Sequence, residues 1–243
     1  MIADLRKLLQ QPFGDTDETL DAFFATGFSP DRCHYLMEND AVVSALYWFD
    51  CQLNGQKLAY LYAVATDEKY RGRGLGHRLM TETHEILKSK GYTGVILVPG
   101  SKELFAMYGK LGYQTTGTVR EFVAKQGQAP VALTEIDAQE YARLRKGYLP
   151  QGGVVQEGAL LAFLGTYARF YKGEDFLLSA TGDGSQLIAQ ELLGNADAAP
   201  GILHTLGLSK GCFRTPGTHR EFAMYLPLTV ECPVPGYFGL ALD

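Results

Sequence analysis

The sequence is poor in cysteine, in long apolar runs and in clustered positive charge, and each shortage excludes a class of protein. Its four cysteines, Cys33, Cys51, Cys212 and Cys232, are widely spaced, so they form neither a Cys-x-x-Cys metal motif nor a disulfide framework. No apolar run approaches the roughly 20 residues of a membrane-spanning helix. The N-terminal stretch lacks the apolar core and cleavage site of a secretory signal. These absences predict a cytoplasmic protein with reduced thiols, no metal and no membrane partner.

The charges are evenly mixed along the chain. There are 22 Lys and Arg against 27 Asp and Glu, which gives a formal net charge of −5. Proteins that bind nucleic acids concentrate Lys and Arg on one face to contact phosphates, whereas the basic residues here are scattered. The composition therefore argues against a nucleic-acid partner and is compatible with a cationic amine substrate.

In the first half of the chain, helical and strand patterns alternate. Leucines at helical spacing predict a helix over residues 75–90, and Gly91 marks its end. The apolar, β-branched run 95–98 is typical of a strand covered on both faces. The other expected elements are helices over residues 1–10, 17–26 and 102–111 and strands over residues 34–38, 42–49, 58–66, 113–118 and 119–125. This alternation predicts the mixed α/β class.

A linker is predicted at residues 127–130, Gly-Gln-Ala-Pro. It divides the chain into one domain over residues 1–126 and a second over residues 131–243. The second domain is expected to hold helices over residues 137–149, 158–171, 185–193 and 200–206 and strands over residues 176–180, 210–215, 222–226 and 237–243. The order of elements after residue 176 parallels that between residues 58 and 125, although residues 181–185 lack the glycine motif described next. A degenerate second copy of the first fold is the resulting hypothesis.

The most informative segment is the hexapeptide Arg71-Gly72-Arg73-Gly74-Leu75-Gly76, which follows a predicted strand and opens a predicted helix. Glycine lets the backbone approach a ligand closely, and the N–H groups of a helix N-terminus attract anions. The pattern thus suits a pyrophosphate, with tight backbone packing as the alternative reason for the glycines. Two other phosphate loops are excluded. A dinucleotide fingerprint, G-x-G-x-x-G, needs its third glycine where His77 stands, and Gly76 comes one place too early. A Walker loop would end in Gly-Lys-Ser/Thr, which is absent.

This hexapeptide resembles the R/Q-x-x-G-x-G/A loop of the GNAT acetyltransferases. Residues 58–66 and 95–100 resemble the family's fourth and fifth strands, and residues 105–113, FAMYGKLGY, are similar to its LYxKLGF helix end. These pieces occur in the family's order over residues 30–120. The resemblance implies the GNAT acyl-CoA N-acyltransferase fold, an α/β protein with a mixed sheet, followed by a degenerate second GNAT-like half.

The resemblance also implies roles for individual residues. Backbone N–H groups from Arg71 through Gly72, Arg73, Gly74 and Leu75 to Gly76 would hold the pyrophosphate of acetyl-CoA, the co-substrate. Val64 and Thr66 would pair with the pantetheine arm. Tyr108 would be the general acid, because a phenol with a pKa of about 10 is protonated at neutral pH and can donate to a departing thiolate. Packing beside Leu104 and Leu111 is the alternative reason for Tyr108, and Ser101 replaces an asparagine common in the family.

The implied function is an N-acetyltransferase that moves the acetyl group of acetyl-CoA to a small amine or a peptide amine. No general base is identified: Tyr60 and Tyr62 could line the acceptor pocket, whereas Asp67 and Glu68 could simply be solvated. The histidines His34, His77 and His84 are expected to have ordinary structural roles. The second half is expected to pack against the first and shape the acceptor pocket. A non-catalytic acyl-CoA sensor is the alternative function, and both the acceptor and a homodimer stay open.

Overall fold

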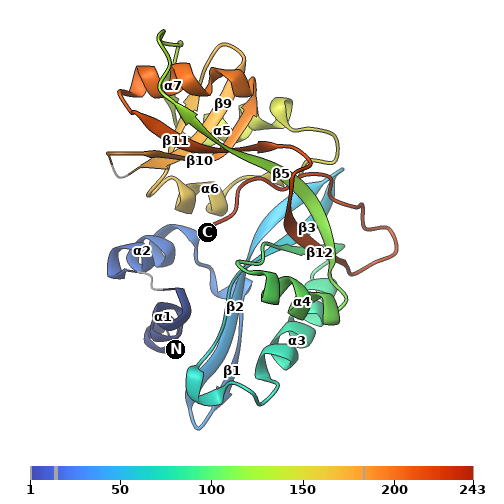
Figure 1. Cartoon of the computed structure of the whole chain (residues 1–243). Coiled ribbons are helices and arrows are strands. Elements are labelled where there is room, and N and C mark those ends of the chain that lie inside the picture. The colour runs from blue at the N-terminus through green and yellow to red at the C-terminus, as the bar shows by residue number, and fades with distance from the viewer. Residues whose placement is uncertain (1, 14–15, 183, 243) are drawn as a thin grey trace.

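The computed structural model describes residues 2–13, 16–182 and 184–242, and it places the strands of both halves in one mixed sheet. Figure 1 shows two lobes joined by strand β5 (Gln114–Lys125), with the C-terminus between them. The strand order is β1-β2-β3-β4-β12-β5-β11-β10-β9-β8-β6, with β7 paired to β2. The expected mixed α/β class is confirmed.

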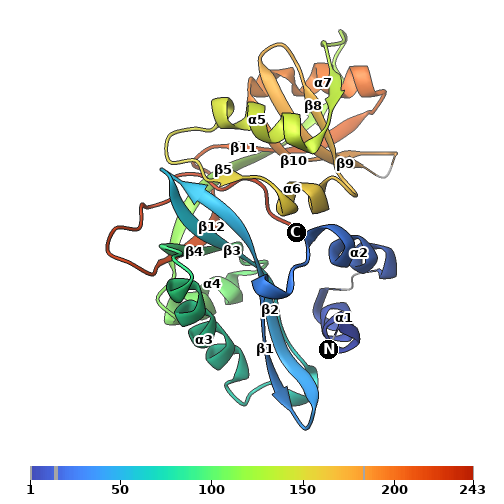
Figure 2. The ribbon, with the colours of Figure 1, turned by 180° about the vertical axis from the view of Figure 1, so that it is seen from behind.

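The first lobe is a sheet with helices on both faces. β1 (Cys33–Glu38), β2 (Ala41–Leu53) and β3 (Gln56–Thr66) are antiparallel neighbours, and β4 (Gly94–Leu97) lies parallel to β3 after the crossover helix α3 (Leu75–Ser89). α1 (Ile2–Phe13) and α2 (Asp17–Ala22) cover one face, while α3 and α4 (Lys102–Lys110) cover the other (Figures 1 and 2). Each face of the sheet has its own buried cluster of apolar side chains. The cluster to which a strand residue belongs therefore shows on which face its side chain lies.

The second lobe repeats part of this arrangement. β8 (Arg169–Lys172), β9 (Phe176–Gly182) and β10 (Leu187–Gly194) are antiparallel, and helix α7 (Ala199–Leu206) leads from β10 to the parallel strand β11 (Lys210–Pro216). α5 (Ala138–Tyr148) and α6 (Ala159–Leu164) lie on the opposite face from α7 (Figure 2). The short strand β6 (Thr134–Ile136) pairs with β8 at the edge of this lobe, whereas β7 (Val155–Gln156) pairs with β2 of the first lobe.

Strand β5 spans both lobes, and strand β12 pairs with it in the first lobe. The beginning of β5 pairs with β12 (Arg220–Pro227), whereas its later residues pair with β11. β12 itself lies between β4 and β5, so a segment from the end of the chain completes the sheet of the first lobe (Figure 1). The division into residues 1–126 and 131–243 therefore stays a prediction, because hydrogen-bonded strands run across it.

Several predicted elements of the second half are wrong. Residues 185–193 were expected to be helical, but β10 occupies residues 187–194, and the expected helix over residues 158–171 ends at Leu164. Of the segment 181–185, Thr181 and Gly182 belong to β9 and residue 183 lies outside the described ones, and the next element is the strand β10 instead of a helix. Within residues 237–242 the described chain contains only an isolated bridge from Tyr237 to Gly153. The strands expected over residues 113–118 and 119–125 are one strand, β5.

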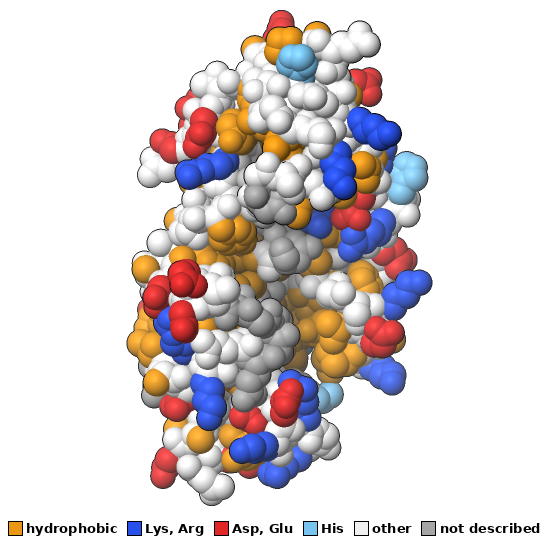
Figure 3. Space-filling model, turned by 60° about the vertical axis from the view of Figure 1, so that its left-hand side comes forward, with side chains coloured by type: hydrophobic (Ala, Val, Ile, Leu, Met, Phe, Trp, Pro, Cys, Tyr) orange, Lys and Arg blue, Asp and Glu red, His pale blue; other side chains and the backbone are white. Residues whose placement is uncertain are grey.

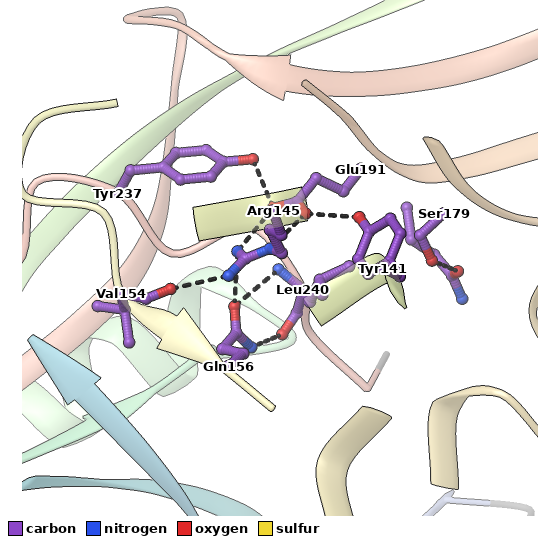
Figure 4. Close-up of polar contacts among 9 residues, drawn as sticks. Tyr141, Arg145, Val154, Gln156, Ser179, Glu191, Tyr237 and Leu240 are labelled. Carbon is purple, nitrogen blue, oxygen red and sulfur yellow. Dashed lines mark hydrogen bonds and ion pairs between the residues drawn. The ribbon is translucent and has the colours of Figure 1, made fainter. Parts of the chain in front are cut away.

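A buried ionic network around Arg145 links α5 and β10 to the segment of β7, which itself pairs with β2 of the first lobe (Figure 4). The Arg145 and Glu191 side chains are 1% and 0% exposed, and Arg145 Nε donates to Glu191 Oε2 at 2.6 Å. Arg145 also donates to the Val154 carbonyl and to Gln156 Oε1. The hydroxyl groups of Tyr141 and Tyr237 donate to the same Glu191 carboxylate. Every charge in this network therefore has partners, as a buried ion pair requires.

Candidate functional site

Strands β3 and β4 diverge in the middle of the first lobe. Their pairing runs from Leu58 opposite Gly94 to Tyr60 opposite Ile96 and ends there. β3 continues alongside β2 as far as Thr66, while the far edge of β4 is occupied by β12. Residues 61–66 of β3 thus have an edge that β4 does not cover. The predicted pantetheine contacts, Val64 and Thr66, both lie on this stretch.

A bulge in β3 lies at the centre of this uncovered stretch. The register between β2 and β3 shifts between Ala45 and Tyr47, and Ala63 has a φ of 55°. A non-glycine residue in this left-handed region costs roughly 1–2 kcal/mol, and such strain concentrates at functional sites. Bulges also turn a strand and redirect its polar groups. Ala63 could not be predicted from the sequence, because no local pattern of residues marks a bulge of this kind.

The glycine loop lies directly beyond this edge, where the chain leaves β3 for α3. Gly72 and Gly74 have φ values of 78° and 76°, and a Cβ at either position would meet nothing within 4 Å. Tight packing therefore does not explain these glycines, and that alternative is wrong for both; the left-handed backbone explains them. The first helical bond runs from Arg78 N–H to Gly74 O, which leaves the preceding N–H groups of α3 without an intrahelical acceptor.

Arg71 and Arg73 stand at the rim of the loop. Arg71 Nε donates to the Thr66 carbonyl at 3.2 Å, and Arg73 Nη1 lies 3.3 Å from Glu38 Oε2. Their side chains are 50% and 56% exposed, so these surface contacts hold them only weakly. Exposed N–H groups, a positive helix end and two adjustable guanidinium groups fit the pyrophosphate of a coenzyme A thioester.

Tyr108 lies on α4 and is 7% exposed. It belongs to the same buried cluster as Leu61 of β3 and Leu97 of β4, which places it on the face of the sheet that α3 and α4 cover. Burial alone raises the pKa of Tyr108 to about 12. The phenol is therefore fully protonated at neutral pH. Ser101 caps α4 by accepting the Leu104 N–H at 3.4 Å, which gives it a structural role.

Tyr60 and Tyr62 face the opposite side of the sheet, toward α1, α2 and the second half. The Tyr60 hydroxyl accepts the Leu242 N–H at 3.1 Å, and its ring centroid lies 4.8 Å from that of Phe238. The Tyr62 ring centroid lies 6.1 Å from that of Phe163, on α6. The second half and the C-terminal segment thus pack directly against this face of β3.

Four of the acidic and histidine side chains considered in the sequence, those of Asp67, Glu68, His34 and His84, make contacts away from the divergence of the strands. Asp67 accepts the Lys69 N–H, and Glu68 pairs with Arg71. His34 bonds to Glu82 at 3.1 Å, and His84 bonds to the Tyr113 hydroxyl at 2.7 Å. Within residues 2–13, 16–182 and 184–242, no group of three metal-ligating side chains comes together.

His84 makes the stability of the protein sensitive to acid. Burial lowers the pKa of His84 to about 4, whereas an unfolded histidine titrates at about 6.5. The stabilisation is present above pH 6.5 and is lost as the pH falls toward 4, because only the unfolded state then gains the proton; after allowance for partial solvation this amounts to about 2 kcal/mol. Urea unfolding at pH 7 and pH 4.5 measures this loss. His84→Gln should reduce it, while His77→Gln, an exposed control on the same helix, should not.

The surface carries no segregated charge on the face shown in Figure 3, where Lys and Arg alternate with Asp and Glu. The same view, which brings the α1 and α2 side forward, shows hydrophobic side chains gathered along one side of a hollow near the middle of this face. None of the helices in the described ranges combines the length and apolar character of a bilayer-spanning segment.

Comparison with known proteins agrees with this geometry. Residues 2–116 match the family model described as an acetyltransferase (GNAT) domain. The chain is 29% identical over 75 residues to N-acetyltransferase family 8 member 2 of Rattus norvegicus, a match that spans 30% of this chain and 33% of that relative.

Solved structures share the whole fold, including the second lobe. GCN5-related N-acetyltransferases from Kribbella flavida and Anabaena variabilis superpose with TM-scores of 0.69 and 0.74 at 22% and 16% identity. These matches cover 92% and 94% of this chain and 68% and 71% of theirs. A tandem GNAT protein from the clavulanic acid biosynthesis pathway matches 95% of this chain and 96% of its own at 11% identity, with a TM-score of 0.57. Residues 2–116 of the chain are thus similar to GNAT acetyltransferases, and the chain has the fold of solved GCN5-related N-acetyltransferases, with a second half that fits the tandem arrangement of one of them.

Proposed function

We propose that this protein transfers the acetyl group of acetyl-CoA to a primary amine. The backbone N–H groups of residues 71–76, with Arg71 and Arg73, would hold the pyrophosphate. Val64 and Thr66 would contact the pantetheine arm along the uncovered edge of β3. Bound acetyl-CoA supplies a thioester, whose carbonyl needs hydrogen-bond donors where negative charge develops.

The single observation that carries this proposal is the divergence of β3 and β4 beside an anion-binding helix end. The strand pairing stops at Tyr60 and Ile96, and the glycine loop follows on the same edge of β3. If the loop holds the pyrophosphate of acetyl-CoA, the thioester end of the molecule could therefore extend between the two strands. Proximity of this kind contributes strongly to bimolecular transfers.

Tyr108 supports catalysis over binding alone. A buried phenol with a pKa of about 12 is a hydrogen-bond donor throughout the neutral range, and Tyr108 lies on the face of the sheet that α3 and α4 cover. A non-catalytic sensor would not need such a donor. A non-catalytic acyl-CoA sensor, the alternative function, would bind coenzyme A without turnover, and Tyr108→Phe would have no effect on it.

The binding part of the proposal predicts that Gly74→Val abolishes tight coenzyme A binding. A β-branched side chain at a φ of 76° is strained and would project beside the exposed N–H groups. Loss of one or two hydrogen bonds to a charged group, at about 1.5–3 kcal/mol each, corresponds to an affinity loss of about 100-fold. Titration calorimetry with coenzyme A measures it.

Gly91→Val is the matched control for this experiment. Gly91 lies just beyond the other end of α3, has a φ of 79°, and also has nothing within 4 Å of its Cβ position. It should impose similar strain without changing coenzyme A affinity. A wild-type protein that does not bind coenzyme A, or a Gly74→Val variant that binds it normally, would refute the proposal.

A further inference from the structure

The hydroxyl of Tyr47 is buried without a hydrogen bond. The residue is 2% exposed, and its hydroxyl oxygen has no partner in the described part of the chain. Burial and then the neighbouring Cys33 thiol raise the pKa of Tyr47, yet no group of the described residues meets the geometry of a hydrogen bond to its hydroxyl. An unsatisfied buried hydroxyl destabilises the folded protein. Since phenylalanine would fill the same space without this cost, the hydroxyl calls for an explanation.

Tyr47 lies beside the divergence of the strands. It is opposite Cys33 of β1 and opposite Tyr62 of β3, so the three residues form a row across three neighbouring strands. Tyr62 is the residue before the bulge at Ala63. The row therefore ends on the β3 edge where the thioester is proposed to lie, on the face opposite Tyr108.

Aromatic rings surround this row. The ring centroid of Phe23 lies 5.0 Å from that of Tyr47 and 5.4 Å from that of Tyr62, and Phe28 lies 5.5 Å from Tyr47. Phe163 of α6 adds a ring from the second half. Phe23 begins a π-helical segment, Phe23–Gly27, a conformation frequent at functional sites. Cys33, Phe28 and Tyr62 are partly exposed, so the cluster reaches the surface.

The groups facing Tyr47 are polar but uncharged. Burial raises the pKa of the Cys33 thiol to about 12 and also raises that of Tyr47, and Cys33 and Tyr62 are the titratable groups that act on the Tyr47 hydroxyl. A hydroxyl among rings can bind an amine nitrogen while the rings contact an apolar substituent. None of these groups is a carboxylate, so they would not compensate the charges of an acceptor with several positive charges, and the cluster does not favour a polyamine.

We propose that the Tyr47 hydroxyl hydrogen-bonds the acceptor amine, and that the Cys33–Tyr47–Tyr62 row with its flanking rings selects a primary amine carried on an aromatic or apolar group. This inference rests on the proposed acetyl transfer. It assigns Tyr47 to acceptor binding and explains why a buried hydroxyl lacks a partner in the free protein.

The test is Tyr47→Phe, assayed with acetyl-CoA and 2-phenylethylamine. Loss of one hydrogen bond, about 1.4 kcal/mol, should raise the KM for the amine about 10-fold. The KM for acetyl-CoA should stay unchanged. The Tm should stay the same or rise, because the variant removes an unsatisfied group; a purely structural hydroxyl would give a lower Tm and no separation of the two KM values.

Tyr92→Phe is the matched control. Its hydroxyl accepts from Trp48 Nε1 at 2.9 Å and donates to Asp50, so its removal should lower the Tm and leave both KM values unchanged. Turnover with an unaltered amine KM in Tyr47→Phe would overturn the assignment, and a preference for spermidine over 2-phenylethylamine would overturn the substrate class. Absence of coenzyme A binding and of turnover in the wild type would instead remove the proposed function itself.

Discussion

Replacing Arg145 with methionine should lower the free energy of unfolding by about 3–5 kcal/mol. The substitution leaves the Glu191 carboxylate buried, with the Tyr141 and Tyr237 hydroxyls as its remaining donors. A carboxylate in an apolar interior without its counter-ion carries most of its desolvation penalty uncompensated. The loss of the donor to the Val154 carbonyl adds to this effect. Urea unfolding monitored by circular dichroism measures the change.

Arg143→Met is the control for this substitution. Arg143 lies on the same helix, its side chain is 70% exposed, and its Nη2 lies 3.8 Å from Glu140 Oε1. A surface pair of this kind contributes less than about 1 kcal/mol. The double variant Arg145→Met with Glu191→Leu should recover much of the lost stability, because it leaves no buried charge. An Arg145→Met protein as stable as Arg143→Met would contradict the central role of the network.

The position of this network explains why the two halves differ. β10 and β11 pair in parallel from Leu187 to Ala189, and the register of β10 against β9 then shifts before Glu191. In the first lobe, β3 likewise pairs in parallel with β4 over a short stretch, and its register against β2 then shifts. Glu191 and its partners thus occupy the place in the second lobe where the first lobe keeps its divergence uncovered.

The turn after β10 has also lost the features of an anion site. Asn195 Oδ1 accepts the Asp197 N–H at 3.0 Å, and Pro200, at the start of α7, has no N–H to offer. Asp197 adds a negative charge at this helix end, where a phosphate would otherwise be attracted. We therefore expect acetyl-CoA to bind in the first half alone.

The sequence predicted the first half well because its signals are local. The hexapeptide 71–76 is contiguous, so its conformation follows from its own glycines. Residues 187–194, LIAQELLG, contain many good helix formers, yet they form a strand because both faces of β10 are covered by other elements. The insertion of β12 between β4 and β5 could not be predicted, since pairing between distant segments leaves no local pattern.

Within the candidate site, too, the features set by contiguous residues could be predicted, whereas those set by strand pairing and tertiary packing could not. The loop and Tyr108 lie in recognisable motifs, whereas Ala63 and Tyr47 do not. The strain at Ala63 arises from the register of β3 against β2. The unsatisfied Tyr47 hydroxyl arises from tertiary packing. Such features become visible only once the pairing of the strands is known.

Tyr108→Phe should reduce kcat about 100-fold, at the low end of the range for acid catalysis, with little change in coenzyme A affinity. The phenol has a pKa of about 12, and the thiol it would protonate has a pKa of about 8.5. Full proton transfer to the thiolate is therefore unfavourable. Tyr108 should act chiefly by donating a hydrogen bond as negative charge grows on the sulfur. Thiol release from acetyl-CoA in the presence of 2-phenylethylamine measures the rate.

Tyr113→Phe is the control, because Tyr113 is 3% exposed, its ring centroid lies 5.7 Å from that of Tyr108, and its hydroxyl bonds to His84. It should reduce stability without a comparable loss of kcat. The pH dependence gives a second test: a donor that deprotonates only near pH 12 keeps its proton through the assay range, so kcat of the wild type should not fall between pH 8 and about pH 10.5. A decline centred near pH 10, absent from Tyr108→Phe, would mean that the phenol titrates as if solvated and that burial does not hold its proton in place.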